Sequence, residues 1–306
     1  MRIVMLGAGG VGGYFGAKLA RAGEDVTFVA RGAHRAAIAA QGLRVRSATD
    51  GEWVVRCAAV EDPAGLPPAD AVFLAVKAND TEAVLQRARP LVGPDTAVVS
   101  LQNGVQSAEI IDRVLGAGHA LGGACYVFAV IEAPGVISHR LLGRIAFGEL
   151  DGRRTPRAER LLAALGKAGI PTELAPDIRR VLWEKYLMIC AQAGMTAVTR
   201  VPSGVLRAHA PTWAMYRAIV GEVAAVGRAE GVALAADAVD TVMKNAEALA
   251  PGALSSLHHD LVNGKPLELE ALHGHLVRLG QRHGVPTPMT QAVYAALLPH
   301  AAGAPA

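Results

Sequence analysis

MRIVMLGAGGVGG, residues 1–13, decides the fold of this 306-residue chain. An apolar strand pattern leads into Gly7, Gly9 and Gly12, which fill the three positions of the G-x-G-x-x-G pattern. The first glycine permits a tight turn, the second lets the backbone approach a pyrophosphate, and the third lets a helix pack closely on a strand. A helical pattern follows, and a second strand pattern occupies residues 25–30. The stretch therefore predicts a dinucleotide-binding βαβ unit.

The cofactor phosphates would lie at the start of the helix after this turn, where unpaired N–H groups and the helix dipole favour negative charge. The residues predicted to contact them are Gly7, Ala8, Gly9, Gly10, Val11 and Gly12. A site that prefers NAD carries Asp or Glu at the end of the second strand. Arg31 stands there instead, and a guanidinium pairs well with a 2′-phosphate. We therefore predict NADP (NADPH), the alternative being that Arg31 is a solvated surface residue.

Composition excludes several classes of protein. Hydrophobic residues make up 52% and charged residues 19%, which is typical of a folded globular chain. The net charge is +3 without a basic run carrying interleaved aromatics, so no nucleic-acid partner is expected. No uncharged apolar run of about 18 residues occurs, so no membrane span is expected. Three isolated cysteines and a chain that begins in a strand, with no signal peptide, predict a cytoplasmic protein.

Two kinds of pattern divide the chain. In the first part, strand-like runs alternate with helical patterns, and the continuous apolar run at 71–76 is typical of a strand covered on both faces. This alternation predicts a Rossmann-type, doubly wound parallel α/β sheet. Beyond Pro176 only helical patterns occur, including one over 267–283. We predict an NADP-binding domain at 1–176, an all-helical substrate and catalytic domain at 177–306, and a site in the cleft between them.

Several spaced motifs resemble those of the ketopantoate reductases (2-dehydropantoate 2-reductases). They are GAGGVG at 7–12, Val76-Lys77-Ala78, Leu101-Gln102-Asn103-Gly104-Val105, Trp183-Glu184-Lys185, Ser255-Ser256 with Asp260, Leu267-Glu268-Leu269-Glu270 and Gly284-Val285-Pro286-Thr287-Pro288. The resemblance runs through nearly the whole chain. It implies a Rossmann domain joined to a helical domain, and NADPH-dependent reduction of a 2-oxo acid to a 2-hydroxy acid on the route to pantothenate.

The resemblance also assigns roles to residues. Lys185 is matched to the group that stabilises the developing alkoxide and protonates it, because hydride attack leaves negative charge on the carbonyl oxygen. Glu268 matches an acidic partner that holds either Lys185 or the cofactor's ribose and carboxamide region. Asn103 would contact the cofactor amide or a substrate oxygen, and Lys77 the cofactor. Ser256 matches a serine that contacts the substrate.

The chain departs from the family pattern at four positions where asparagines are expected to hold the substrate. These positions carry Ile189, Ala193, Ser203 and Ala253. Residues 185, 192 and 196 lie along one stripe of a helix, so Gln192 and Thr196 are predicted to contact substrate beside Lys185. Losing buried amides changes selectivity strongly. The substrate is therefore predicted to be 2-dehydropantoate or a related, less polar 2-oxo acid.

Two alternative functions and the oligomeric state stay open. One alternative function is an NADP-dependent dehydrogenase acting on another small carbonyl compound or hydroxy acid. Another is an NADPH-sensing regulator that has lost catalysis, although such a binder has no need of Lys185 and Glu268. The paired histidines at 258–259 and 273–275 lack metal-ligand spacing, so no metal is predicted. Alanine-rich C-terminal helices are compatible with a homodimer, but no residue specifies one.

Overall fold

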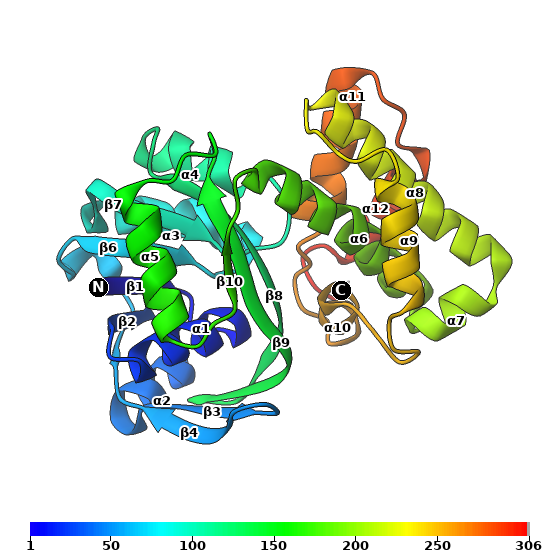
Figure 1. Ribbon diagram of the computed structural model, residues 1–306. Helices are drawn as coiled ribbons and strands as arrows, with labels where there is room; N and C mark the ends of the chain where they lie inside the picture. Colours follow the sequence, from blue (N-terminus) through cyan, green and yellow to red (C-terminus); the bar gives the residue numbers. More distant parts are fainter. Residues whose placement is uncertain (305–306) are drawn as a thin grey trace. The chain divides into compact units, whose positions relative to one another are not determined.

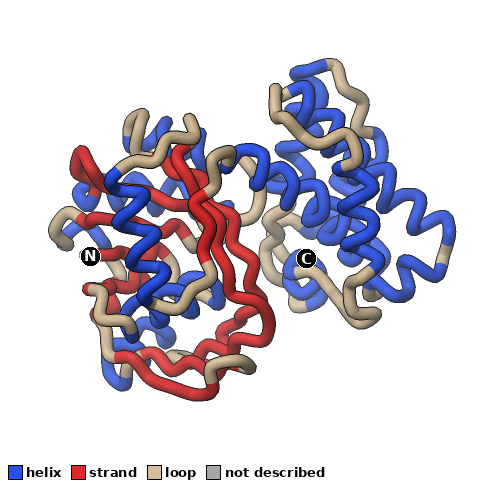
Figure 2. The backbone as a smooth tube through the Cα atoms, viewed as in Figure 1, coloured by secondary structure: helices blue, strands red, loops and turns tan. Residues whose placement is uncertain are grey.

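The computed structural model describes residues 1–304. Their contacts divide the chain into two compact units, one formed by Met1–Gln102 with Ser107–Ile178 and the other by Asn103–Gln106 with Arg179–Ala306. The first unit contains every strand of the described chain, and the second is helical (Figures 1 and 2). The segment 103–106 lies within the range expected for the first domain, yet it groups with the helical unit.

The first unit is built on one ten-stranded sheet with the order β4-β3-β9-β8-β7-β6-β1-β2-β5, and β10 pairs with β9. The strands are β1 (Arg2–Leu6), β2 (Asp25–Val29), β3 (Leu43–Ser47), β4 (Gly51–Val55), β5 (Ala58–Val60), β6 (Ala69–Leu74), β7 (Val92–Ser100), β8 (Ala120–Ala133), β9 (Val136–Glu149) and β10 (Thr172–Leu174). The helices are α1 (Gly10–Arg21), α2 (Gly32–Gln41), α3 (Thr81–Ala88), α4 (Ser107–Leu115) and α5 (Pro156–Lys167), with 3₁₀ turns at Pro63–Gly65, Ala78–Asp80 and Arg89–Leu91.

Both faces of the central sheet are buried. Along β1, Ile3 and Met5 belong to a core that includes residues of α1 and α5, whereas Val4 and Leu6 belong to a second core with residues of α3 and α4. Successive side chains of a strand point to opposite faces, so this alternation shows helices packed on both sides. β1 pairs in parallel with β2 and β6, and β6 with β7. The predicted doubly wound α/β fold is confirmed.

The sheet is mixed rather than wholly parallel. β8 and β9 form a long antiparallel pair, and β3 pairs antiparallel with β4. The alternating patterns predicted a parallel sheet, so these antiparallel pairs differ from the prediction. Gly135, with φ +76°, provides the turn between β8 and β9, and a tight turn permits antiparallel pairing without a crossover helix.

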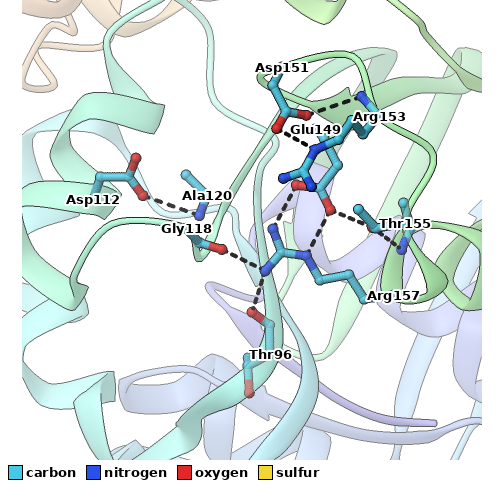
Figure 3. Close-up of polar contacts among 10 residues, drawn as sticks. Thr96, Asp112, Gly118, Ala120, Glu149, Asp151, Arg153, Thr155 and Arg157 are labelled. Atoms are coloured by element: carbon cyan, nitrogen blue, oxygen red, sulfur yellow. Dashed lines mark hydrogen bonds and ion pairs between the residues drawn. The ribbon is translucent and has the colours of Figure 1, made fainter.

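A buried ion pair ties the end of β9 to α5. Arg157 Nη2 lies 2.6 Å from Glu149 Oε2, and Arg157 Nε lies 2.8 Å from Oε1 (Figure 3). Thr155, the N-cap of α5, also donates to Glu149 at 2.6 Å. Arg157 donates onward to the carbonyl of Gly118 at 2.7 Å. One hydrogen-bonded network thus joins β9, the start of α5 and the loop at Gly118.

The second unit packs its helices around one apolar core. They are α6 (Ile178–Thr199), α7 (Ser203–Ala208), α8 (Ala210–Ala229), α9 (Ala238–Glu247), α10 (Ser256–Val262), the π-helical turn η4 (Glu270–Gly274), α11 (His275–His283), α12 (Pro288–Leu297) and a 3₁₀ turn at Leu298–His300. In the described part of the chain, no helix has the length and apolar character needed to cross a membrane.

One predicted helix begins later than expected. The pattern over 267–283 predicts helix from Leu267, but helical structure starts at Glu270 with η4. Leu267 lies before the helix, donates its N–H to the Ala301 carbonyl at 2.9 Å and is buried together with Leu269. Leu269 is the N-cap of η4 and already has α-helical dihedral angles, so both leucines are buried although helical structure begins only after them.

Candidate active site

The glycine turn has the geometry that a dinucleotide loop needs. Gly7 has φ +106°, a region that favours glycine, and a side chain there would also lie 2.8 Å from the Ala75 backbone. A Cβ at Gly12 would overlap the Gly7 carbonyl, so α1 packs against the turn only because residue 12 is glycine. At Gly9, the N-cap of α1, a Cβ would meet nothing within 4 Å. Open space at Gly9 fits the approach of a pyrophosphate.

His34 fixes this turn from outside the glycine pattern. Its Nε2 lies 2.8 Å from the Ala8 carbonyl oxygen, and its Nδ1 accepts the Gly135 N–H at 3.0 Å. A carbonyl accepts and an N–H donates, so His34 is the neutral tautomer with its proton on Nε2. Burial lowers the pKa of His34, and the hydrogen bond to Ala8 opposes that effect. His34 thus joins the turn, α2 and the β8–β9 hairpin.

Two arginines gather at the start of α2. Arg31 is the N-cap residue and Arg35 lies one turn further along the same face. The Arg31 side chain is 74% exposed and pairs with Asp80 at 3.0 Å, while Arg35 Nε is buried without a hydrogen-bond partner among the described residues. Like charges four residues apart, at the positive end of a helix, destabilise that helix. An anion such as a 2′-phosphate would relieve this repulsion.

Gln102 joins the ends of two neighbouring strands. Its Nε2 donates to the Val76 carbonyl at 2.9 Å and to Thr81 Oγ1 at 2.7 Å. Its Oε1 accepts from Ser107 at 3.1 Å. Lys77 follows Val76, so it stands just beyond the carboxyl end of β6, the edge of an open α/β sheet where ligands bind. Gln102 therefore fixes the backbone next to Lys77.

Asn103 begins the short segment that belongs to the helical unit. Gly104 has φ +97°, and a Cβ there would lie 3.0 Å from the Ala271 carbonyl oxygen of η4. Val105 packs against the helical core. The structure thus places the Asn103 loop beside the turn that follows Glu268.

α6 presents Lys185 on its less buried stripe. Lys185, Met188, Ile189 and Gln192 are all half-buried, whereas the side chains around the remainder of the helix are mostly enclosed. These positions are three or four residues apart, so they share one face. The residues next to Lys185 on this face are apolar, and Ala193 is buried within the core. Gln192 supplies the polar group of the stripe.

Gln192 brings together positions that are far apart in the sequence. Its Nε2 donates to Ser203 Oγ at 2.8 Å, and Ser203 Oγ donates to the Ala253 carbonyl at 3.1 Å. Gln192 Oε1 is buried and has no hydrogen-bond partner among the described residues. All four of the chain's departures from the family pattern therefore lie on or next to α6, at Ile189, Ala193, Ser203 and Ala253.

Thr196 and Ser256 have different surroundings. Thr196 is fully buried, donates to the Gln192 carbonyl at 2.7 Å and lies 2.7 Å from Ser255 Oγ. Ser255 caps α10 by accepting the His258 N–H at 3.0 Å. Thr196 therefore anchors the α10 cap to α6. Ser256 is exposed at the first turn of that helix, and substrate contacts by Thr196 and Ser256 stay predictions.

Glu268 and Glu270 are distinguished by their environments. Glu270 pairs with Arg278 at 2.6 Å and accepts the Tyr294 hydroxyl. Burial would raise the pKa of Glu270, but the hydrogen bonds from Tyr294 and Arg278 outweigh it and lower that pKa. Glu270 thus forms its polar contacts with Arg278 and Tyr294 of its own unit. Glu268 lies half-buried in the segment just before η4, close in sequence to Ala271, which Gly104 approaches.

No group of three or more His, Cys, Asp or Glu residues with metal-binding geometry occurs in residues 1–304. The described residues instead include an open glycine turn, a pair of arginines and a half-buried lysine.

Residues 3–152 match the family model described as "Ketopantoate reductase PanE/ApbA", and residues 177–301 match its C-terminal model. The chain belongs to the ketopantoate reductase family. Membership confirms the family and the class of enzyme predicted from the motifs, an oxidoreductase of the 2-dehydropantoate 2-reductase type that uses a nicotinamide cofactor.

Individual relatives match along their whole length. A 2-dehydropantoate 2-reductase from Mesorhizobium japonicum is 33% identical over 96% of each chain. Another, from Archaeoglobus fulgidus, is 35% identical and covers 93% of this chain and 92% of its own. The crystal structure of a PanE/ApbA family ketopantoate reductase from Ralstonia eutropha JMP134 has a TM-score of 0.90 at 33% identity, covering 98% of each chain.

Several residues that contact the predicted cofactor-binding segments were not predicted from the sequence. Gln102 lies inside the Leu101–Val105 motif, and that motif is the signal that could have indicated it. His34 and Asp80 act on residues far along the chain, and no local pattern announces either contact. Their contributions become visible only when the strands are placed side by side.

Proposed function

We propose that this chain reduces a 2-oxo acid to the corresponding 2-hydroxy acid with NADPH, and that Lys185 donates the proton. One observation carries the proposal: three segments with matched family residues pack together in the helical unit. α6 carries Lys185, the segment before η4 carries Glu268, and Asn103 opens the loop beside Ala271. A bond from Tyr186 to the Leu272 carbonyl, 2.6 Å long, joins the first two segments.

The chemistry requires a cation that can also release a proton. Bound NADPH supplies the hydride. Lys185, as an ammonium, would stabilise the negative charge that develops on the carbonyl oxygen and then protonate it. Glu268 would orient Lys185 or hold the ribose and carboxamide region. Asn103 can both donate and accept, which suits a cofactor amide or a substrate oxygen.

NADPH is preferred over NADH in this proposal because of the charge at α2. The glycine turn, from Gly7 through Gly12, would hold the pyrophosphate. Arg31 is exposed and within reach of a ligand, and Arg35 adds a second positive charge one turn away. A 2′-phosphate would be the anion that these two guanidinium groups hold. Lys77 would contact the same cofactor from the end of β6.

The substrate proposal follows from the side chains next to Lys185. Met188 and Ile189 are half-buried on its face, where the family pattern expects an amide at 189. A site with fewer amides discriminates less strongly in favour of hydroxylated substrates. We propose a less polar 2-oxo acid as the preferred substrate, with Gln192 as the polar contact. The alternative within this class is an NADP-dependent dehydrogenase of another small hydroxy acid.

Replacing Lys185 tests the proton donor. In K185A, kcat for NADPH oxidation should fall by about two decades or more, while the NADPH dissociation constant changes by less than about threefold. Lys244 is an exposed lysine of α9 and offers a matched control, since K244A should keep wild-type kcat. A K185A enzyme with wild-type kcat would contradict the proposal. If the wild-type protein binds NADPH but reduces none of 2-dehydropantoate, 2-oxoisovalerate and phenylpyruvate, the alternative of an NADPH-sensing regulator without catalysis is favoured.

Restoring the missing amides tests the substrate class. The double variant I189N/A193N should raise kcat/KM for 2-dehydropantoate relative to 2-oxoisovalerate by about tenfold or more. Single I189N should give most of the gain, because Ile189 is half-buried whereas Ala193 is enclosed. The proposal of a less polar substrate would be overturned if wild-type enzyme reduced 2-dehydropantoate efficiently at micromolar concentrations and showed no preference for 2-oxoisovalerate.

A further inference from the structure

Two buried hydrogen bonds connect α6 to η4, and they run in opposite directions. Tyr186, on α6, donates its hydroxyl to the Leu272 carbonyl at 2.6 Å. His273, on η4, lies with Nε2 at 2.9 Å from the Cys190 carbonyl oxygen of α6. Both side chains are almost completely buried. Each element therefore holds the backbone of the other through a side chain.

The His273 contact fixes a single protonation state. Because a carbonyl can only accept, Nε2 carries the proton and Nδ1 does not. Burial lowers the pKa of His273 to about 4, which the bond to Cys190 opposes, so the ring is neutral near pH 7. A Cβ at Gly194 would lie 2.5 Å from Nε2 and 2.8 Å from Val293 Cγ1. Glycine at 194 is what allows α6 to approach the imidazole.

The π-helical geometry of η4 is part of the same arrangement. The Gly274 N–H bonds to the Leu269 carbonyl at 3.0 Å, five residues back, which inserts an extra residue into the turn. Such widened turns are rare and frequently lie at functional sites. Here the turn directs Leu272 and His273 toward α6. A regular α-helical turn would rotate these two groups away from their partners.

Both bonds lie just beyond the proposed catalytic groups in sequence. Tyr186 follows Lys185 directly, and Leu272 and His273 follow Glu268 by about one helical turn. With two bonds between the elements, α6 can neither slide along η4 nor rotate against it without losing a buried partner. Leaving a buried donor or acceptor unpaired is costly. The register between the Lys185 and Glu268 backbones is therefore fixed by these contacts.

We propose that Tyr186 and His273 are positioning residues that hold Lys185 and Glu268 in one working arrangement, an inference that rests on the proposed role of Lys185. Neither residue touches the reacting atoms in this proposal. They act by setting where the ammonium and the carboxylate stand. A displacement of about 1 Å at a reacting group can cost a hundredfold in rate.

The core of this unit contains a matched control. Tyr216, on α8, is fully buried like Tyr186, but its hydroxyl has no hydrogen-bond partner among the described residues. Y186F and Y216F thus remove the same atom from similar surroundings, one from a bond to η4 and one from no bond. At position 273, Met removes the donor, whereas Gln can place an amide N–H near the site of Nε2.

The first measurement is steady-state kinetics of the full-length enzyme. Y186F and H273M should lower kcat about tenfold or more, with the NADPH dissociation constant changed less than twofold and the pH profile of kcat displaced. H273Q should recover most of the kcat lost in H273M, and Y216F should match wild type. Circular dichroism confirms that each variant is folded. Lower thermal stability with unchanged kcat and an unchanged pH profile would reduce both residues to structural roles and overturn the proposal.

A second measurement does not depend on turnover. The chain has six lysines, so ¹³Cε lysine NMR can follow the titration of Lys185, assigned from the resonance lost in K185R. Y186F and H273M should move the Lys185 titration midpoint, and Y216F should leave it in place. An unmoved midpoint in both variants overturns the positioning role. If K185A retains wild-type kcat while these variants move the midpoint, the proton-donor proposal fails and the positioning contact stands.

Discussion

The Gln102 amide nitrogen lies 2.9 Å from the Val76 carbonyl oxygen, so one side chain bridges the carboxyl ends of β6 and β7. Lys77 follows one of these residues and Asn103 follows the other. Two residues matched to cofactor contacts are thus positioned from a single amide. We therefore expect changes at Gln102 to affect cofactor binding.

Replacing Gln102 with Leu should weaken cofactor binding and stability together. The Val76 carbonyl and the Thr81 hydroxyl would lose their shared partner inside the protein, at a cost of about 1–3 kcal/mol in the free energy of unfolding. The KM for NADPH should rise severalfold. S107A removes only the 3.1 Å bond to Oε1 and should show a much smaller effect in both assays. A Q102L enzyme with wild-type KM for NADPH would contradict this expectation.

Asp80 should compete with the cofactor for Arg31. The two side chains form an exposed ion pair at 3.0 Å, and exposed pairs contribute up to about 1 kcal/mol. D80N should therefore tighten NADPH binding about two- to fivefold and leave NADH binding unchanged. R31A should weaken NADPH far more than NADH. Fluorescence titration of both cofactors with each variant checks this, and equal losses for the two cofactors in R31A would refute the 2′-phosphate contact.

His34 should make the first unit sensitive to mild acid. Its pKa in the folded protein is below the ordinary value of 6.5, mainly because of burial. The unfolded chain then binds a proton more readily, so stability is lost as pH falls from about 6.5 toward the folded-state pKa. Protonation would also place an Nδ1–H against the Gly135 N–H.

Urea unfolding of wild type and H34Q between pH 7.5 and 5 measures this contribution. Stability of wild type should fall more steeply with acidification than that of H34Q. At pH 7.5 the H34L variant should bind NADPH about tenfold more weakly, since the Ala8 carbonyl loses its partner. If the free energy of unfolding fell equally steeply with pH in wild type and H34Q, the His34 ring would not be held neutral by the turn.

Glu149 and Asp151 provide a comparison between a buried and an exposed ion pair (Figure 3). The side chains of Glu149 and Arg157 are 7% and 15% exposed, whereas those of Asp151 and Arg153 are 52% and 77% exposed. Removing one member of a buried pair leaves a charge without compensation, so E149Q should cost about 3–5 kcal/mol. D151N should cost less than about 1 kcal/mol. Chemical denaturation at pH 7 measures both.

Glu149 also makes the stability of the fold depend on pH, in a more acidic range than His34 does. Burial would raise the pKa of Glu149, but hydrogen bonds from Arg157 and Thr155 outweigh it and hold the pKa below its ordinary value of 4.5. A lowered folded-state pKa stabilises the fold above about pH 4.5, and that stability disappears as pH falls through the folded-state value. E149Q should therefore lose less stability than wild type between pH 5 and pH 3.

Local patterns predicted the parts of this molecule that depend on neighbouring residues. The glycine turn, the strand before it and the apolar strand predicted at 71–76, most of which lies in β6, follow from residues close in sequence. The contacts that hold the site do not. His34 and Gly135 are 101 residues apart, and Tyr186 and Leu272 are 86 residues apart. Such bonds depend on which strands and helices become neighbours, and that information is absent from any short window of sequence.

The direction of β8 and the start of η4 illustrate the same limit. An apolar run indicates burial but not whether its partner runs parallel or antiparallel, which here depends on the Gly135 turn. Leu267 and Leu269 fit the pattern of a helix face, but the Leu267 N–H bonds to the distant Ala301 carbonyl and helical structure begins later, at Glu270.

The membership of Asn103–Gln106 in the helical unit means that the backbone passes between the two units three times, after Gln102, after Gln106 and after Ile178. A gene fragment beginning at residue 179 would encode the helices but omit Val105, which packs against their apolar core. The order in which the ribosome makes the chain also matters, because these four residues emerge long before the helices that receive them. The helical unit therefore cannot be completed by its own contiguous stretch of sequence.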